Sequence, residues 1–223
     1  MLKEETSMPD FVATILAALI GSVIGSVGAV LADHWLTERN ERSHRREILI
    51  QRYIFQLQDA LEMLYYRLRN LAFQGGKYVM TDDYFEQTTL YALGRTLALE
   101  RIFALEAVYP QFDTVYPGLG KFMKEYRIDF KLQHSNFYRY DRIALAEAVI
   151  EREGDAFRVS TYLEFRKRYE TANSLEKQWL MPAGRAIQSL SVSQMEDLLA
   201  AVKTKAQGVA KKTGINSSLV RDN

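Results

Sequence analysis

The run from Phe11 to Ala32 contains no charged residue and is bracketed by Asp10 and Asp33. As an α-helix rising about 1.5 Å per residue, it would be roughly 33 Å long, close to the hydrocarbon thickness of a bilayer. A buried helix of a soluble domain is usually shorter. A cleaved signal peptide starts with basic residues, whereas residues 1–10 contain three acidic residues and one lysine. The run therefore predicts a transmembrane helix.

Basic residues flank this run unequally. Lys3 precedes it, whereas five arginines follow it within residues 39–52. Because Lys and Arg gather on the cytoplasmic side of membrane helices, we expect the N-terminus outside and the rest of the chain in the cytoplasm. Trp35 is expected to lie at the interface, where an indole can bury its ring and keep its N–H hydrated, and Arg39 and Arg42 to mark the inner boundary.

Small residues recur along the predicted membrane helix at spacings of three and four. Ala18, Ser22, Gly25, Ala29 and Ala32 follow this spacing, and Gly21 and Gly28 widen the stripe. Small side chains on one face let two helix backbones approach closely, and Gly21 with Gly25 forms a GxxxG pair. The stripe predicts helix packing within the membrane, although small residues are also common in membrane helices that do not associate.

Composition favours a mostly helical chain. No proline lies between Pro9 and Pro110, and 48% of residues are hydrophobic, enough to fill a core. A net charge of +1 does not favour nucleic acid as a partner, and the absence of cysteine excludes disulfides and thiolate metal sites. We expect a mostly α fold in which the transmembrane helix continues into a cytosolic helical bundle.

Five segments are expected along the chain. They are a short extracytoplasmic N-terminus (1–10), the transmembrane helix (11–32), a helical neck (33–49), the cytosolic helical domain (50–213) and a flexible tail (214–223). The neck is expected to be helical because its Glu and Arg residues form i,i+4 pairs in the favoured order.

A heptad-like seam begins the expected cytosolic domain. Its apolar residues alternate spacings of four and three: Ile50, Ile54, Leu57, Leu61, Leu64, Leu68 and Leu71. This is the pattern of a helix that packs along a partner helix. The partner can belong to the same chain, as in a bundle, or to a second copy, as in a coiled coil, and both remain open here.

A second helix is predicted from Asp83 to Tyr109, ahead of Pro110, with apolar residues on two sides that make it central and buried. Arg95 and Glu106 project from it in the same direction, about three turns apart. Because buried charges need partners, we predict a buried polar pair at these two residues, in either an internal salt-bridge network or a ligand site.

Further helices are expected over residues 119–132, 140–153, 161–172 and 174–190, the last with a break or kink at Pro182. A final helix is expected to start at Ser193, with Glu196 completing a capping box. Its weak apolar stripe leaves two interpretations open. The helix can dock onto the bundle late in folding, or it can lie free of the bundle.

No catalytic, cofactor or metal motif is found. The histidines, His34, His44 and His134, have no metal-ligand spacing, and the sequence has no phosphate-binding glycine loop or nucleophile elbow. We therefore predict no cofactor, no metal and no enzymatic activity. Aromatic residues interleaved with arginines over 137–169 are a candidate interaction surface, although aromatic residues at helical spacing more often belong to a core.

Three short segments follow the predicted anchor and arginine-rich neck along the chain, at residues 64–68, 89–95 and 162–165. They read LYYRL, TLYALGR and YLEF. The layout of residues 10–190 resembles a family of uncharacterised bacterial single-pass membrane-anchored helical proteins. The resemblance implies a bacterial inner (cytoplasmic) membrane protein, and it carries over no activity and no site residue.

Two functions are consistent with these features. The first is a non-catalytic interaction or scaffold protein that self-associates as a homo-oligomer or joins other membrane subunits, with the lipid bilayer as its other partner. The second is a membrane-localised signalling or defence effector whose cytosolic domain senses a ligand.

Overall fold

The computed structural model describes residues 34, 36–41, 43–44, 46–73, 83–126, 128, 138–171 and 175–220. The predicted transmembrane helix (11–32) and the N-terminus (1–10) lie outside these residues. Within the described ranges, no helix is both long enough and apolar enough to cross a membrane. The chain divides into two units, Met1–Glu47 and Ile48–Asn223. In the first unit, each described residue from 34 onward is helical and exposed.

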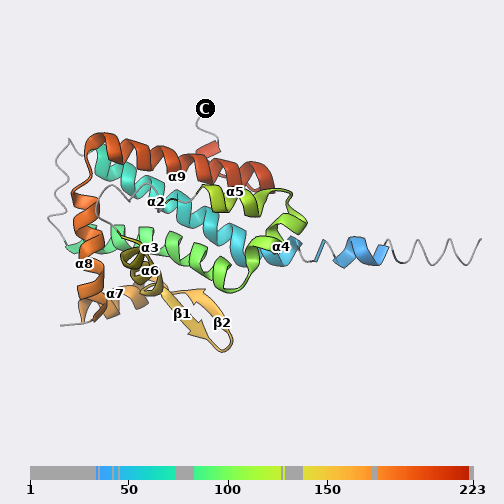
Figure 1. Ribbon diagram of the computed structural model, residues 1–223, viewed down its shortest axis with the longest axis horizontal. Coiled ribbons are helices and arrows are strands. Elements are labelled where there is room, and N and C mark those ends of the chain that lie inside the picture. The colour runs from blue at the N-terminus through green and yellow to red at the C-terminus, as the bar shows by residue number, and fades with distance from the viewer. Residues whose placement is uncertain are drawn as a thin grey trace, which may run out of the picture. The chain divides into compact units, whose positions relative to one another are not determined.

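The second unit is mostly helical and is built on three long helices (Figure 1). A single π-turn, η1 (Ile50–Ile54), leads into α2 (Phe55–Phe73), which packs against both α3 (Asp83–Leu105) and α9 (Val192–Thr213). Residues later in α2 contact residues earlier in α3: Asp59 pairs with Arg95, whereas Arg67 hydrogen-bonds to Thr89. The two helices are therefore antiparallel.

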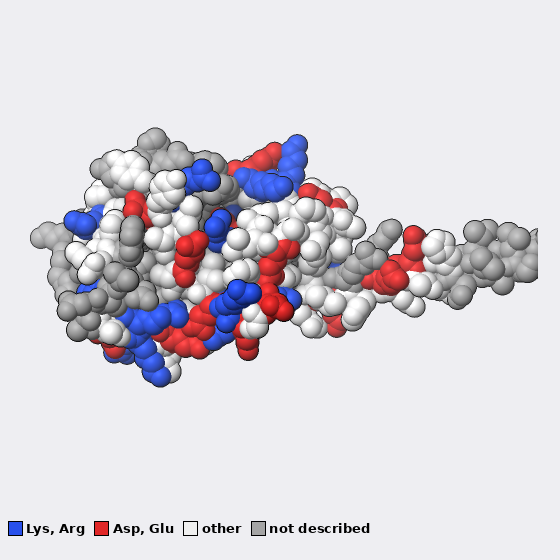
Figure 2. Space-filling model, turned by 60° about the horizontal axis from the view of Figure 1, so that its bottom comes forward, with Lys and Arg blue, Asp and Glu red and all other residues white. Residues whose placement is uncertain are grey.

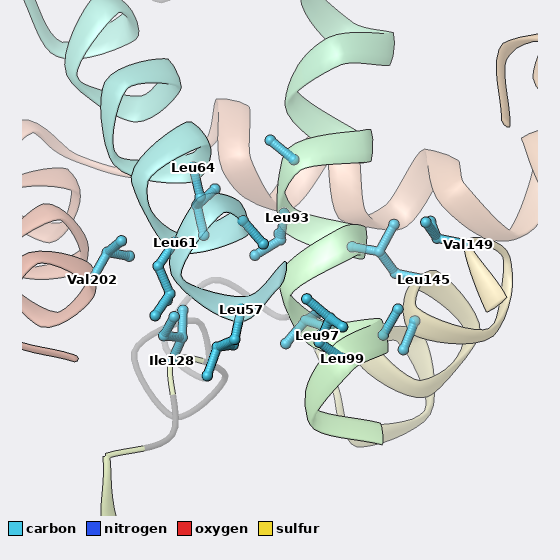
Figure 3. Packing of buried hydrophobic residues seen from close by; sticks show 14 of the residues in the cluster. Leu57, Leu61, Leu64, Leu93, Leu97, Leu99, Ile128, Leu145, Val149 and Val202 are labelled. Carbon is cyan, nitrogen blue, oxygen red and sulfur yellow. The ribbon is translucent and has the colours of Figure 1, made fainter. Parts of the chain in front are cut away.

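The heptad-like seam is buried inside this unit. Leu57, Leu61 and Leu64 lie between α3 and α9, where Leu93 and Leu97 approach from one side and Val202 from the other (Figure 3). Six of the seven seam residues are buried, and Ile50 is partly buried. The seam therefore packs within the chain.

The last helix is an integral part of the bundle. Val202, Ala206 and Val209 of α9 are buried against the rest of the core. Its N-cap is Ser191, which forms a capping box with Gln194, two residues before the predicted cap at Ser193. Either serine can cap, and Ser191 leaves Met195 buried in the first turns of the helix.

The expected tail is partly packed, which corrects the prediction for residues 214–220. Gly214 ends α9 with a left-handed backbone (φ 75°), and η3 (Ser218–Val220) follows. Leu219 is buried, and the Gln58 side chain donates to Ser217 Oγ at 2.8 Å. The chain therefore folds back onto α2, with Leu219 as an apolar anchor.

The predicted second helix ends four residues early. Its last helical residue is Leu105, and Ala107 takes a left-handed conformation (φ 51°) at the N-cap of α4 (Val108–Val115). Pro110 lies in the first turn of α4, where its missing N–H costs no helix hydrogen bond. The next helix, α5 (Leu119–Glu125), lies against α9.

A β-hairpin replaces the end of the helix expected at 140–153. Helix α6 (Arg139–Glu147) is followed by β1 (Ile150–Glu153) and the antiparallel strand β2 (Ala156–Val159), joined by Gly154 and Asp155. Gly154 has a φ of 61°, which suits a two-residue hairpin turn. The chain then forms α7 (Tyr162–Glu170) and α8 (Leu175–Gln188), which contains Pro182.

Candidate functional site

A cavity of about 350 Å³ lies between the start of the α2 segment and the β-hairpin. Its floor is apolar, because Leu99 and Ile102 of α3 are buried beneath it. Strand β2 contributes Ala156, Phe157 and Val159. The remaining lining residues are Arg52, Tyr53, Gln56, Glu153 and Arg158. The cavity thus combines an apolar floor with a polar rim.

Glu106 joins three elements beside this cavity. Its carboxylate accepts hydrogen bonds from the Tyr53 hydroxyl at 2.5 Å and from the Phe157 backbone N–H at 3.0 Å. Arg52 makes a longer contact with the same carboxylate at 3.4 Å. The left-handed Ala107 directly follows, so the sharp end of α3 places Glu106 toward both the π-turn and the hairpin. Glu106 therefore holds the two walls of the cavity together.

Arg95 and Glu106 do not contact each other, because the two residues have different partners; each forms a salt bridge within the chain, as one of the two predicted alternatives expected. Arg95 forms an ion pair with Asp59 of α2 at 2.7 Å, and Glu106 binds Tyr53, Phe157 and Arg52. Eleven residues along a helix correspond to roughly 16 Å, which is beyond the reach of the two side chains. The helix also ends before Glu106.

The surroundings of the Tyr53 hydroxyl change its pKa. Burial and the hydrogen bond to Glu106 raise the pKa of Tyr53 to about 12. The phenol therefore remains protonated at neutral pH and keeps donating to the Glu106 carboxylate. The Arg52 guanidinium lies 5.1 Å from the centre of the Tyr53 ring, a cation–π contact that further organises the π-turn.

Arg158 is surrounded by carboxylates on the hairpin side of the cavity. It pairs with Glu151, with Glu164 at 2.9 Å and with Glu153 at 3.5 Å. These hydrogen bonds and charges raise the pKa of the Arg158 guanidinium above its usual range. Figure 2 shows that acidic and basic side chains also lie next to one another elsewhere on the face in view. The charges of Arg158 are thus satisfied within the chain.

Glu164 also caps the helix that follows the hairpin. Its carboxylate accepts from the Thr161 backbone N–H at 2.7 Å, while the Thr161 hydroxyl caps the Glu164 N–H. The bonds from Arg158 first, and from Thr161 second, lower the pKa of Glu164 to about 2. Arg168 of α7 binds Glu151 at 2.7 Å and Ser160 Oγ at 3.0 Å. The base of the hairpin is therefore fixed by ionic contacts.

A buried ion pair crosses the core away from the cavity. The Lys205 side chain of α9 is 0% exposed and donates to the Glu100 carboxylate of α3, which is 9% exposed. This pair was not predicted from the sequence. A signal was present, because Lys205 lies on the apolar stripe of α9 between Val202 and Val209.

The predicted membrane residues lie mostly outside the described part of the chain. The small-residue stripe (18–32), Trp35 and Arg42 are not described, and Arg39 lies in the exposed helical segment of the first unit. The aromatic cluster is divided. Phe165 and Tyr169 belong to the core, whereas Tyr138 and Tyr140 are exposed. Among the described residues of that cluster, only Phe157 and Arg158 line the cavity.

Metal-ligand clusters of three or more His, Asp or Glu residues do not occur among the described residues. The chain matches no known family model, and no significant similarity was found to curated proteins or to solved structures. Function is therefore inferred from this chain's own residues.

Proposed function

We propose that this chain is a non-catalytic interaction or scaffold protein, anchored in the bacterial inner membrane by residues 11–32, with its helical domain in the cytoplasm. The uncharged run between Asp10 and Asp33 carries this proposal, together with the arginines that follow it.

The fold of the second unit indicates which part of the chain would associate. Because Leu57, Leu61 and Leu64 are buried against α3 and α9, the seam has no face left for a second copy. Association would then use the small-residue stripe of the predicted membrane helix, where Gly21 and Gly25 allow close backbone contact. The proposed partners are a second copy of this chain or other membrane subunits.

Native mass spectrometry of the full chain, purified from its own membrane in mild detergent, tests this proposal. We expect a homo-oligomer or a complex with another subunit. The double variant Gly21→Leu/Gly25→Leu should shift the population to the monomer, because the larger side chains separate the helix backbones. Val27→Leu, which helical periodicity places opposite the small-residue stripe of the predicted helix, is the matched control and should leave the assembly intact. A wild-type monomer without any copurifying protein would contradict the proposal.

A second candidate function is favoured by the cavity at the π-turn. The proposal of a membrane-localised signalling or defence effector needs a ligand site in the helical domain. A cavity of about 350 Å³ with an apolar floor and polar rim falls at the lower end of the range for small-molecule sites.

A further inference from the structure

We infer that the cavity between η1 and β2 binds a short, water-soluble amphipathic carboxylic acid, with its apolar body on Leu99 and Ile102 and its carboxylate at Arg52 and Gln56. This site deepens the second candidate function and does not depend on the association of the chain.

The floor and one wall of the cavity select an apolar body. Leu99 and Ile102 lie beneath it, and Ala156 and Val159 border it on the β2 side. Water in contact with these side chains forms few hydrogen bonds, and displacing it with apolar atoms contributes about 25 cal/mol per Å² of surface buried. The small volume favours a short ligand over a long acyl chain.

Arg52 is the cation on the rim that has donors to spare. Its 3.4–3.5 Å contacts with Glu106 are long for hydrogen bonds, and Glu106 is already satisfied by shorter bonds from Tyr53 and Phe157. The Arg52 side chain is 47% exposed, so a ligand can reach it from solvent. A guanidinium with donors to spare binds a carboxylate well, because it can offer two parallel N–H groups.

The other polar groups of the cavity restrict what the ligand head can be. Arg158 is held by three glutamates, and the Tyr53 hydroxyl donates to Glu106, so neither is available as a donor. Gln56 lies four residues after Arg52, one helical turn along, and its amide can add a donor beside the guanidinium. The Glu153 carboxylate is directed to Arg158. The free donors therefore select a head that accepts hydrogen bonds.

The π-turn is a second observation, independent of the cavity itself. A single π-turn inserted into an α-helix is frequently found at functional sites. Here η1 contains Arg52 and Tyr53, both of which line the cavity, and Glu106 fixes the position of Tyr53. The Arg52 side chain is thus presented by a helix and held over the Tyr53 ring, which organises the site before a ligand arrives.

Ligand-observed ¹⁹F NMR on the full chain in phosphatidylcholine nanodiscs tests the site. The probes are 3-(4-fluorophenyl)propionate and the matching alcohol and amine, with empty nanodiscs correcting for partition into lipid. We expect the acid to bind with a Kd on the order of 1 mM, the alcohol more weakly and the amine not at all. Amine binding as strong as acid binding would overturn the inference.

Two variants localise the probe, and a third is the matched control. Arg52→Gln should weaken acid binding about tenfold, the equivalent of one lost charge-assisted contact, and leave alcohol binding unchanged. Ala156→Leu should abolish binding of every probe by filling the cavity. Arg166→Gln removes a similarly exposed arginine outside the cavity and should change nothing. Equal losses in Arg52→Gln and Arg166→Gln, or binding that survives Ala156→Leu in folded protein, would refute the site. Either result leaves the mass measurement of the assembly unaffected.

Discussion

Replacing Lys205 with methionine is expected to lower the free energy of unfolding by about 3–5 kcal/mol, the usual cost of removing one partner from a buried ion pair. The Lys205 side chain is fully buried, and the Glu100 carboxylate that it contacts is 9% exposed. Without the ammonium group, Glu100 must either stay charged in the core or take up a proton, and both are unfavourable. Urea unfolding of the full chain in detergent, followed by far-UV circular dichroism, measures this loss.

The double variant Lys205→Met/Glu100→Leu separates the ion pair from simple packing. Replacing both partners with apolar residues of similar size is often close to neutral, so we expect most of the lost stability to return. Lys211→Met, at an exposed position on the same helix, should change stability by less than about 0.5 kcal/mol. If the double variant is as unstable as Lys205→Met alone, the unpaired Glu100 carboxylate is not the cause of the lost stability.

Replacing Leu64 with alanine is expected to cost about 2–5 kcal/mol, because the side chain is 0% exposed and its removal leaves a cavity between α2 and its neighbours. The midpoint of thermal unfolding should fall and should not depend on protein concentration. Leu163→Ala, at a side chain that is 60% exposed, is the control and should have a small effect.

The same variant decides between the two partners that the seam pattern left open. If the seam packs within the chain, Leu64→Ala lowers the stability of the protein and leaves its oligomeric state unchanged. A seam shared between two copies would lose assembly instead, and its unfolding would become concentration-dependent. Native mass spectra of Leu64→Ala that show dissociation without loss of monomer stability would contradict the packing within the bundle.

The helical class and the long amphipathic elements could be predicted because they depend on local periodicity. The spacing of Leu57, Leu61 and Leu64 defined a buried face, and α2 ends at Phe73, two residues before the Gly75-Gly76 pair of the sequence. The hairpin was missed because its strands are only four residues each and carry several charges. Its signals, Gly154 in a two-residue turn and the facing pair Glu151 and Arg158, make sense only once the strands are paired.

The cavity could not be predicted because it depends on contacts between distant segments. Glu106 was recognised as unusual, but its partners Tyr53 and Phe157 lie about fifty residues away on either side, and no periodicity connects them. Its position also depends on Ala107, whose left-handed backbone ends α3 without a glycine or proline signal. Helical phase alone therefore paired Glu106 with the wrong residue.

The topology of the full chain is the most direct test of the account. A C-terminal epitope is placed on the chain, spheroplasts are treated with protease, and their membranes are then washed at alkaline pH. A transmembrane helix at residues 11–32 with the helical domain inside predicts an intact epitope that stays in the membrane pellet. An epitope that is digested in spheroplasts, or released into the alkaline supernatant, would contradict it.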